Sequence, residues 1–366
     1  MDEQMTQMKR RLQALTSIAA VSGYEDPVIR HIRSELEASG DEVRVDALGN
    51  VTVKMNRIEG KDPYRVMIFA HMDELGLVVT HIEETGFLRL ERLGGIPEKS
   101  LAGQTVRAET GGRTWHGVIG TKAHHVTPSE EKYRVLPVSE VFADFGFRSR
   151  QEAEEAGMHV GMPVVYARQF FDNGTRVFSN ALDNRVGCLA LLELADRVRG
   201  QTLPCELYLV FSVQEEFNLR GVLPAVRRID PHLAITLDIT IATDTPDLNR
   251  KGRIALGGGP SIGMYTFHGR GTLGGLIPNP KLVRHIQRVA NDHDIPLQPA
   301  VFMGILTDAS FSQLENEGFP MVDLGYPARY THAPVESVDL IDVDGLIRLL
   351  ERLLPTLDGS ADFSRG

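Results

Sequence analysis

The sequence predicts an α/β fold, a sheet flanked by helices, with a small β-barrel-like domain inserted into it. Two observations support this fold class. Helical stripes and apolar strands alternate at the start of the chain and again after residue 179. Between them, short strands are separated by glycine-rich turns, as in a small barrel or sandwich. We therefore expect one α/β domain made of residues 1–73 and 179–366, with residues 74–178 forming an inserted β-rich domain.

The first part of the chain contains both helix and strand signals. Apolar residues recur at helical spacing near the N-terminus, and again at Val28, Ile29, Ile32 and Leu36. β-branched stretches within 43–53 turn at Leu48-Gly49-Asn50, which predicts a pair of short strands. The apolar run "YRVMIFA" (64–70) predicts a buried strand.

The middle part reads as β-rich. It contains "LGLVVTHI", "GFLRLERL", "GQTVRAE", "TWHGVIGT" and "MPVVYARQ", with a turn at Thr110-Gly111-Gly112-Arg113. A short helix is expected over 148–156.

The last part returns to the α/β rhythm. A helix is expected over 184–198, followed by strands "CELYLVFSV", "HLAITLD" and "FPMVDLG". Asn279-Pro280 is a good cap followed by a good first helical residue, and apolar spacing marks a final helix after Val343.

The charge argues against certain partners, and the cysteine content indicates the compartment. The formal net charge of the 366 residues is -10, which argues against nucleic acid and anionic membranes as partners. No run approaches the roughly 18 apolar residues of a membrane span. Cys188 and Cys205 lie in apolar surroundings, which favours a reducing compartment over a disulfide framework. We expect a cytoplasmic protein.

Polar residues gather where the predicted strands end, the edge at which open α/β sheets bind ligands. Asp183 stands at the start of a predicted helix and can reach the same edge. The residues that follow strands are His71, Asp73, Glu215, Glu216, Asp238 and His332.

This set of side chains is typical of a hydrolytic site for divalent metals, because imidazole and carboxylate are their common ligands. "LVFSVQEEF" places Glu215 and Glu216 at the end of a hydrophobic strand with no basic neighbour. Buried carboxylates require a counter-charge, and metal ions would supply it. The sequence has no His-Glu-x-x-His motif, which excludes a zincin-type protease.

Three other motifs are interpreted as loops. Gly259 to Gly263 fits a nucleophile-elbow pattern, but Pro260 precedes Ser261 and no helix is expected after it. Gly269 to Gly274 fits a dinucleotide fingerprint without the required strand and helix. His124-His125 falls in a polar stretch, where a mobile loop is favoured over a metal site.

The motifs taken together resemble the TET-type di-zinc aminopeptidases, metallopeptidase family 42 of clan MH, which includes glutamyl and deblocking aminopeptidases. The resemblance covers nearly the whole chain and includes "LTSIAAVSGYE", "AHMDELGLVV", "GTKAHHVTPSEE", "ALDNRVGC", "VQEEFNLRG", "LDITIATDTP" and "YTHAPVESVDL". It implies a zinc-exopeptidase sheet, and an inserted β-domain that builds dimers and often tetrahedral dodecamers. It also implies that short peptides are the substrates.

The resemblance also implies a role for each candidate residue. His71, Asp183 and Asp238 would bind one zinc or cobalt ion, and Asp183 would bridge to a second ion held by Glu216 and His332. Two divalent cations against three carboxylates leave one positive charge, which favours a bridging hydroxide as nucleophile. Asp73 would orient the His71 imidazole. Glu215 would act as general base.

The chain departs from the family pattern beside these glutamates. Phe217-Asn218 stands where Val-Gly is expected, and because Asn tolerates left-handed backbone angles better than most residues, the loop can be kept with a differently shaped pocket beside Glu216. Asp308 lies in a region that lines the pocket in relatives and has no assigned role. His268 or Arg270 would favour acidic N-terminal residues.

Two rival functions stay open. Glucan hydrolysis would need two carboxyl groups about 5–9.5 Å apart across a sugar without a metal pair. A non-catalytic assembly protein could keep the fold, although the full ligand set argues against it.

Overall fold

The computed structural model describes residues 3–60, 62–268 and 274–365. Its helices, including short 3-10 segments (η), are α1 (Glu3–Ser17), α2 (Asp26–Ala38), η1 (Glu98–Ser100), η2 (His124–Val126), η3 (Val138–Glu140), α3 (Arg150–Glu155), α4 (Leu182–Val198), α5 (Glu215–Asn218), α6 (Leu223–Ile229), α7 (Pro280–Asp292), α8 (Ala309–Ser312), α9 (Leu340–Leu353) and η4 (Leu354–Thr356).

The strands fall into two groups. Those of a large sheet are β1 (Val43–Val45), β2 (Val51–Lys54), β3 (Arg65–His71), β10 (Phe170–Asn173), β11 (Arg176–Ser179), β12 (Glu206–Ser212), β13 (Leu233–Ile241), β14 (Ser261–Phe267), β15 (Gly275–Leu276), β16 (Gln298–Met303), β17 (Met321–Arg329) and β18 (Glu336–Asp339). Those of a barrel are β4 (Gly76–Ile82), β5 (Leu88–Leu93), β6 (Thr105–Thr110), β7 (Arg113–Ile119), β8 (Phe142–Asp144) and β9 (Pro163–Tyr166).

In the described part of the chain, the large sheet has twelve strands. Nine follow the order β1-β2-β12-β3-β13-β17-β18-β11-β10, β14 also pairs with β17, and β15 and β16 pair with β14. Its centre is parallel, because β12, β3, β13 and β17 run in one direction. The carboxyl ends of these four strands therefore meet at one edge of the sheet.

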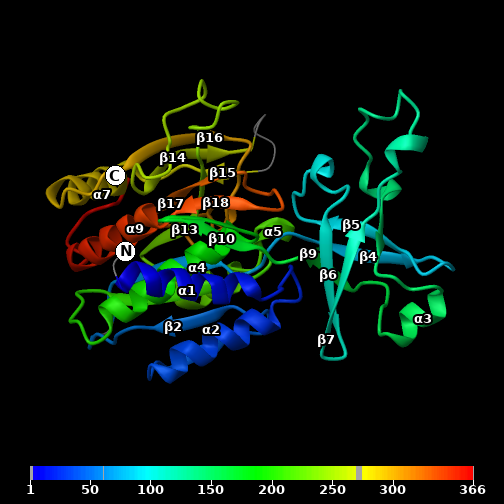
Figure 1. Ribbon diagram of the computed structural model, residues 1–366. Helices are drawn as coiled ribbons and strands as arrows, with labels where there is room; N and C mark the ends of the chain where they lie inside the picture. Colours follow the sequence, from blue (N-terminus) through cyan, green and yellow to red (C-terminus); the bar gives the residue numbers. More distant parts are fainter. Residues whose placement is uncertain (1–2, 61, 269–273, 366) are drawn as a thin grey trace.

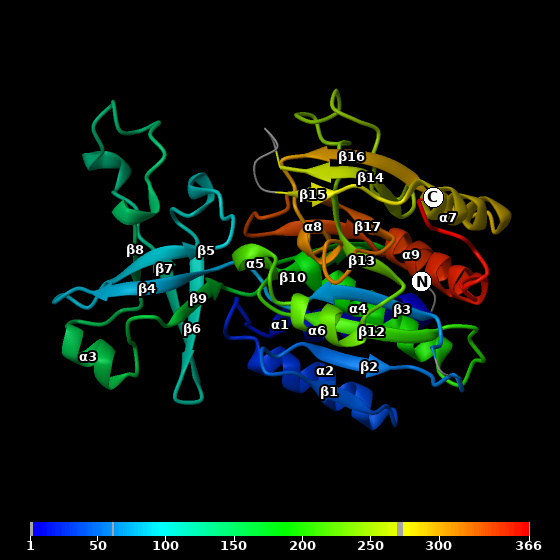
Figure 2. The same cartoon turned by 180° about the vertical axis from the view of Figure 1, so that it is seen from behind.

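Helices cover both faces of this sheet. Alternate residues of β3 show the two faces, since Val66 and Ile68 pack in one core and Met67 and Phe69 in another. The first core includes residues of α1, α2, α4, α7 and α9, and the second includes residues of α6 and α8. Figure 1 shows α1 in front of the sheet, and Figure 2 shows α6 in front from the opposite side.

The barrel is a separate body with its own apolar core, in which Leu77, Leu90, Val106 and Ile119 are buried. Its six described strands close in the order β4-β5-β8-β7-β6-β9. It lies to one side of the large sheet, with α5 near the junction (Figures 1 and 2). The predicted fold class, a helix-flanked α/β sheet with an inserted barrel, is confirmed.

The strand β10 and all but the last residue of β11 lie within the range 74–178 expected for the inserted domain. However, β11 pairs with β18 and β10 pairs with β11, so both extend the large sheet. The division of the chain into domains stays a prediction. The expected short helix over 148–156 corresponds to α3. No helix in the described ranges combines the length and apolarity that crossing a bilayer requires.

Candidate metal centre

Two neighbouring parallel strands bring His71 and Asp238 to the carboxyl edge of the sheet. His71 is the last residue of β3, as expected. Asp238 was expected where its strand ends, but β13 continues to Ile241. The strand continues because it keeps one hydrogen-bonded neighbour. β13 pairs with β3 only as far as Thr236, but it pairs with β17 as far as Ile241.

Asp183 faces two imidazoles at once. It stands at the start of α4, where the backbone is not yet helical. Its Oδ1 lies 3.3 Å from Nε2 of His71, and its Oδ2 lies 3.6 Å from Nε2 of His332. One carboxylate therefore lies between two histidines that are far apart in the sequence.

The candidate ligands form compact groups in space. In each group, one ligand atom per residue lies within 4.8 Å of the others. His71, Asp183 and Asp238 form one group, and Asp183, Glu216 and His332 form another, so that Asp183 is shared. A third group contains His71, Glu215 and Glu216. The structure thus brings together all the residues that the sequence singled out as metal-ligating.

Glu215 and Glu216 reach the site because the strand has ended before them. β12 stops at Ser212, Gln214 takes a left-handed conformation with φ +59°, and the one-turn helix α5 begins at Glu215. The carboxylate of Asp73 accepts the N–H of Glu215 at Oδ1 and the N–H of Glu216 at Oδ2, each at 3.1 Å. The end of β3 therefore holds the first turn of α5 in place.

The loop after the two glutamates reverses at Leu219. Asn218 is the last residue of α5, and Leu219 adopts the positive φ of 54°. The tolerance of Asn218 for left-handed angles is therefore not used here, because the turn of helix includes Asn218 and the reversal comes one residue later. Phe217 is 55% exposed, and the Arg220 guanidinium lies 5.7 Å from its ring centroid.

The centre carries an excess of negative charge. In the described part of the chain, the ion pairs of Asp183, Glu215 and Glu216 are with the two imidazoles and with no Arg or Lys. Burial raises the pKa values of Glu215, Glu216 and Asp238 well above their usual range. Such carboxylates need a cationic counter-charge to be ionised at neutral pH.

The pKa values of His71 and Asp73 are instead shifted in the direction that favours their charged forms. Burial by itself would lower the pKa of the His71 imidazole, but the surrounding carboxylates, Glu215 first, outweigh it and raise that pKa. Burial would raise the pKa of Asp73, yet the contact with His71 and the hydrogen bonds that it accepts lower it. Asp73 is therefore a stable anion beside His71, with Oδ1 3.4 Å from Nδ1.

Three residues that hold the candidate ligands were missed by sequence reasoning. Glu336 accepts the backbone N–H of Asp183 and that of His332, both at 2.9 Å. The carbonyl oxygen of Gly95, from the loop after barrel strand β5, lies 3.1 Å from Nδ1 of His332. Ser22 donates its hydroxyl proton to Asp73 at 2.6 Å. Glu336 lies in the motif "YTHAPVESVDL", but its hydrogen bonds to the backbone of two candidate ligands could not be predicted from the sequence.

The donor set fits divalent metal ions. Asp183 Oδ1 and Glu216 Oε1 are buried and accept no hydrogen bond. Unpartnered buried carboxylate oxygens are costly unless a cation compensates them. Imidazole nitrogen and carboxylate oxygen are ligands of zinc and related divalent ions. The residues present can therefore hold the metal that the resemblance implies.

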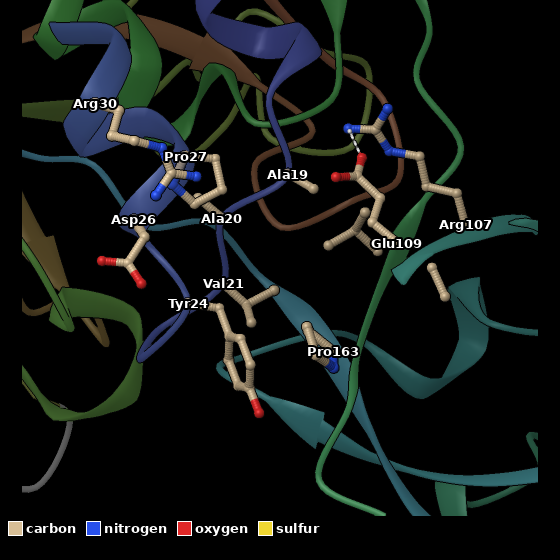
Figure 3. Close-up of a pocket in the computed structure, with 12 residues that line it drawn as sticks. Ala19, Ala20, Val21, Tyr24, Asp26, Pro27, Arg30, Arg107, Glu109 and Pro163 are labelled. Carbon is tan, nitrogen blue, oxygen red and sulfur yellow. Dashed lines mark ion pairs between the residues drawn. The ribbon is translucent and has the colours of Figure 1, made fainter. Parts of the chain in front are cut away.

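Another cavity, of about 270 Å³, lies between the start of α2 and the barrel (Figure 3). Arg30 and Asp26 border it from α2, and Arg107 and Glu109, which form an ion pair of 3.5 Å, border it from β6. None of the predicted site residues lines this cavity. It is therefore distinct from the candidate metal centre.

The three loop motifs have different outcomes. Ser261 begins strand β14, and its Oγ shares a hydrogen bond with Thr240 Oγ1, so the segment is not a nucleophile elbow. The expectation of a loop is wrong for residues 261–263, because they pair with β16 and β17. His124 and His125 are exposed in a one-turn segment and belong to none of the described metal-ligand groups. Residues 269–273 of the glycine-rich motif, including Arg270, lie outside the described residues.

A parallel sheet with clustered histidines and carboxylates at its carboxyl edge, with a barrel beside it, has the donor groups that a metallopeptidase requires. The chain belongs to the M42 glutamyl aminopeptidase family, whose model matches residues 49–349. It is an aminopeptidase, and the family resemblance expected from the sequence is confirmed.

Relatives and solved structures support this assignment over nearly the whole chain. A lysyl aminopeptidase of Pyrococcus furiosus is 35% identical over 343 residues, 92% of this chain and 94% of that protein. The structure of aminopeptidase APDkam598 from the archaeon Desulfurococcus kamchatkensis is similar with a TM-score of 0.90 and 35% identity, covering 98% of this chain and 99% of that one. The TET1 peptidase of Pyrococcus horikoshii, which can assemble into a tetrahedron or a large octahedral shell, matches with a TM-score of 0.84 and 30% identity, over 95% and 99%.

Proposed function

We propose that this aminopeptidase removes N-terminal residues from short peptides at a centre that binds two divalent metal ions, zinc or cobalt. His71, Asp183 and Asp238 would hold one ion. Asp183, Glu216 and His332 would hold the other. The observation that carries the proposal is the position of Asp183, whose two carboxylate oxygens face different imidazoles at 3.3 and 3.6 Å.

Metal ions bound here would supply an acidified water molecule and a polarised scissile carbonyl. Glu215 lies outside both of the groups that share Asp183, with Oε2 3.8 Å from Nε2 of His71. Its carboxylate would take a proton from water and pass it to the leaving amine. Asp73 would fix the orientation of His71, because both its carboxylate and its carbonyl oxygen lie beside Nδ1.

A matched pair of variants tests these roles. Glu215→Gln should keep the metal content of the wild type and lose turnover by about 100-fold or more, as expected for a general base. Glu216→Gln should lose metal, because an amide is a weaker ligand than a carboxylate. Metal content is measured by elemental analysis and turnover with aminoacyl nitroanilides. Loss of metal in the first variant and retention in the second would reverse the assignment.

The exopeptidase character has its own test. A free α-amine is required if the substrate binds through it to the metal centre or to a nearby carboxylate. Peptides with a free N-terminus should be cleaved, and their N-acetylated counterparts should not. Equal rates on the two would contradict removal from the N-terminus.

We further propose that the protein works as a homo-oligomer built from dimers, with a tetrahedral dodecamer as the expected form. The assembly of the similar TET1 peptidase supports this. Sedimentation of the purified protein tests it, and a monomer at micromolar concentration would contradict it. Cys188 and Cys205 are both buried and unpaired, which supports the expectation of a reducing, cytoplasmic compartment.

A further inference from the structure

The segment that carries the two candidate glutamates is held by side chains from other parts of the chain. Residues 213–216 donate four consecutive backbone N–H groups to side-chain oxygens. Asp73 accepts the last two, and Asn50 accepts the first at 3.3 Å. The remaining N–H group, that of Gln214, is donated to Oε1 of Glu25 at 3.1 Å. Glu25 lies 189 positions away in the sequence and has no assigned role.

Gln214 is the residue at which the chain changes direction. It adopts φ +59° and ψ +29°, between the end of β12 and the start of α5. A left-handed conformation is unfavourable for a residue with a Cβ and persists only where surrounding contacts hold it. If β12 continued instead, Glu215 and Glu216 would point to opposite faces of the sheet. The turn at Gln214 therefore allows both carboxylates to reach one centre.

Glu25 is fixed in place by the start of α2. Its carbonyl oxygen accepts the backbone N–H groups of Val28 and Ile29, each at 3.0 Å. A polar side chain at this position commonly caps its own helix, but that of Glu25 forms no such hydrogen bond and reaches Gln214 instead. Only 3% of Glu25 is exposed. An anchored backbone therefore directs this carboxylate at the turn.

No cation accounts for the burial of the Glu25 carboxylate. Glu25 takes part in no ion pair within the described ranges. Burial raises the pKa of Glu25 to about 7, the Asp73 carboxylate adds to the shift, and backbone N–H groups offset only part of it. A buried carboxylate beside another carboxylate costs stability. What Glu25 supplies here is an acceptor for the N–H of Gln214.

The loop that leads into α2 supports the same segment at a second point. Ser22 donates its hydroxyl proton to Oδ2 of Asp73 at 2.6 Å. The same oxygen accepts the N–H of Glu216. Residues 22–25 are thus linked both to the left-handed turn and to the first turn of α5.

We propose that Glu25 is a positioning residue that holds the left-handed turn at Gln214 and thereby aims Glu215 and Glu216. This inference rests on the proposed function, because Glu25 acts through the proposed base and the proposed metal ligand. Metal–ligand distances tolerate only about 0.2 Å. A misplacement of about 1 Å in an active site can cost about 100-fold in rate. Relaxation of the turn therefore weakens both zinc binding and turnover.

Three substitutions separate this role from a general effect on the fold. Glu25→Gln keeps an oxygen that can accept the N–H of Gln214. Glu25→Met has a similar size but no acceptor. Glu25→Asp keeps the charge, but its side chain is one methylene shorter, which withdraws the carboxylate from Gln214. Aspartate is a preferred residue before a helix, so Glu25→Asp should fold at least as well as the wild type.

The metal-loaded protein and its metal-free form are compared for each variant. In a competition with a chromogenic chelator, Glu25→Met and Glu25→Asp should bind zinc at least about ten-fold more weakly than the wild type. At saturating zinc, their kcat should fall at least about ten-fold while KM stays within about three-fold. Glu25→Gln should stay within about three-fold of the wild type in all three quantities. The visible spectrum of the cobalt-substituted protein should change in Glu25→Met and Glu25→Asp and be preserved in Glu25→Gln.

Asp342→Leu is the matched control for Glu25→Met. It also removes a buried carboxylate that accepts backbone N–H groups, those of Gly257 and Gly259. The control should lower the thermal midpoint and leave zinc affinity and kcat unchanged.

A second variant tests the turn itself. Glycine adopts the left-handed conformation without the penalty of a Cβ. The double variant Glu25→Met/Gln214→Gly should therefore regain at least about three-fold in kcat over Glu25→Met.

Two results would overturn the inference. One is wild-type zinc affinity and kcat in Glu25→Asp, which also covers the case in which Glu25→Met does not fold. The other is a loss in Glu25→Gln as large as that in Glu25→Met, because the hydrogen bond from Gln214 would then not be the cause. A wild-type protein that binds no zinc, or releases no N-terminal residue, would instead refute the proposed function.

Discussion

Gly95→Ala tests whether the barrel helps to position a metal ligand. Gly95 lies in the loop between β5 and η1, and its carbonyl oxygen is 3.1 Å from Nδ1 of His332. A Cβ at this position would lie 2.7 Å from Nδ1 and 3.0 Å from Cε1 of the same ring. The added methyl group therefore displaces the imidazole without removing any proposed ligand.

The size of the displacement follows from these distances. Non-bonded heavy atoms are optimally separated by about 3.5 Å, so the ring must move by about 0.8 Å from the 2.7 Å contact. Metal–ligand distances tolerate about 0.2 Å. We therefore expect metal affinity or activity to fall about 10- to 100-fold, as for other changes to groups that orient a metal ligand.

The assay is a zinc titration of the metal-free variant, with peptidase activity as the readout, followed by kcat/KM at saturating zinc. Gly252→Ala is the control, because its Cβ would meet Thr243 at 3.1 Å rather than a candidate ligand. If Gly95→Ala had the same zinc affinity and the same kcat/KM as the wild-type protein, the reasoning would be refuted. His332 could not then be a metal ligand held in this position.

Other perturbations have equally definite outcomes. A chelator should abolish activity and lower the thermal midpoint, since ions present at 100 times their Kd stabilise the folded state by about 2.7 kcal/mol each. Glu336→Gln should weaken metal binding about 10- to 100-fold, because one amide oxygen cannot accept both N–H groups as the two carboxylate oxygens do. Burial raises the pKa of Asp342 from 3.8 to about 7, so its stabilising contribution is complete below about pH 4 and is lost as pH rises through 7. Denaturant melts should show Asp342→Asn gaining stability relative to wild type over that interval.

Each of these has a contrary result. Activity that survives chelation would remove the metal mechanism. Unchanged zinc affinity in Glu336→Gln would mean that the two backbone contacts do not position the ligands. A constant stability difference between wild type and Asp342→Asn from pH 4 to 8 would show that this carboxyl does not titrate between the folded and unfolded states.

Much of the architecture was predictable from local patterns. Apolar strands followed by polar residues predicted an α/β sheet with functional side chains at its carboxyl edge, and the glycine-rich middle part predicted a small barrel or sandwich. His71, Asp183 and His332 were found in this way, because strand ends and helix starts can be read from neighbouring residues. The extent of β13 beyond Asp238 was not predictable, since it depends on pairing with β17.

The sequence by itself determined the fold class, the family and the candidate ligands, because each depends on residue type and local spacing. Only the tertiary structure decided that one carboxylate lies between His71 and His332, that Gly95 contacts a candidate ligand 237 positions away, and that Asp323 and Asp238 line the same small cavity. These are contacts between residues remote in sequence. No periodicity encodes them, since they arise from how the strands pair and where the barrel lies against the sheet.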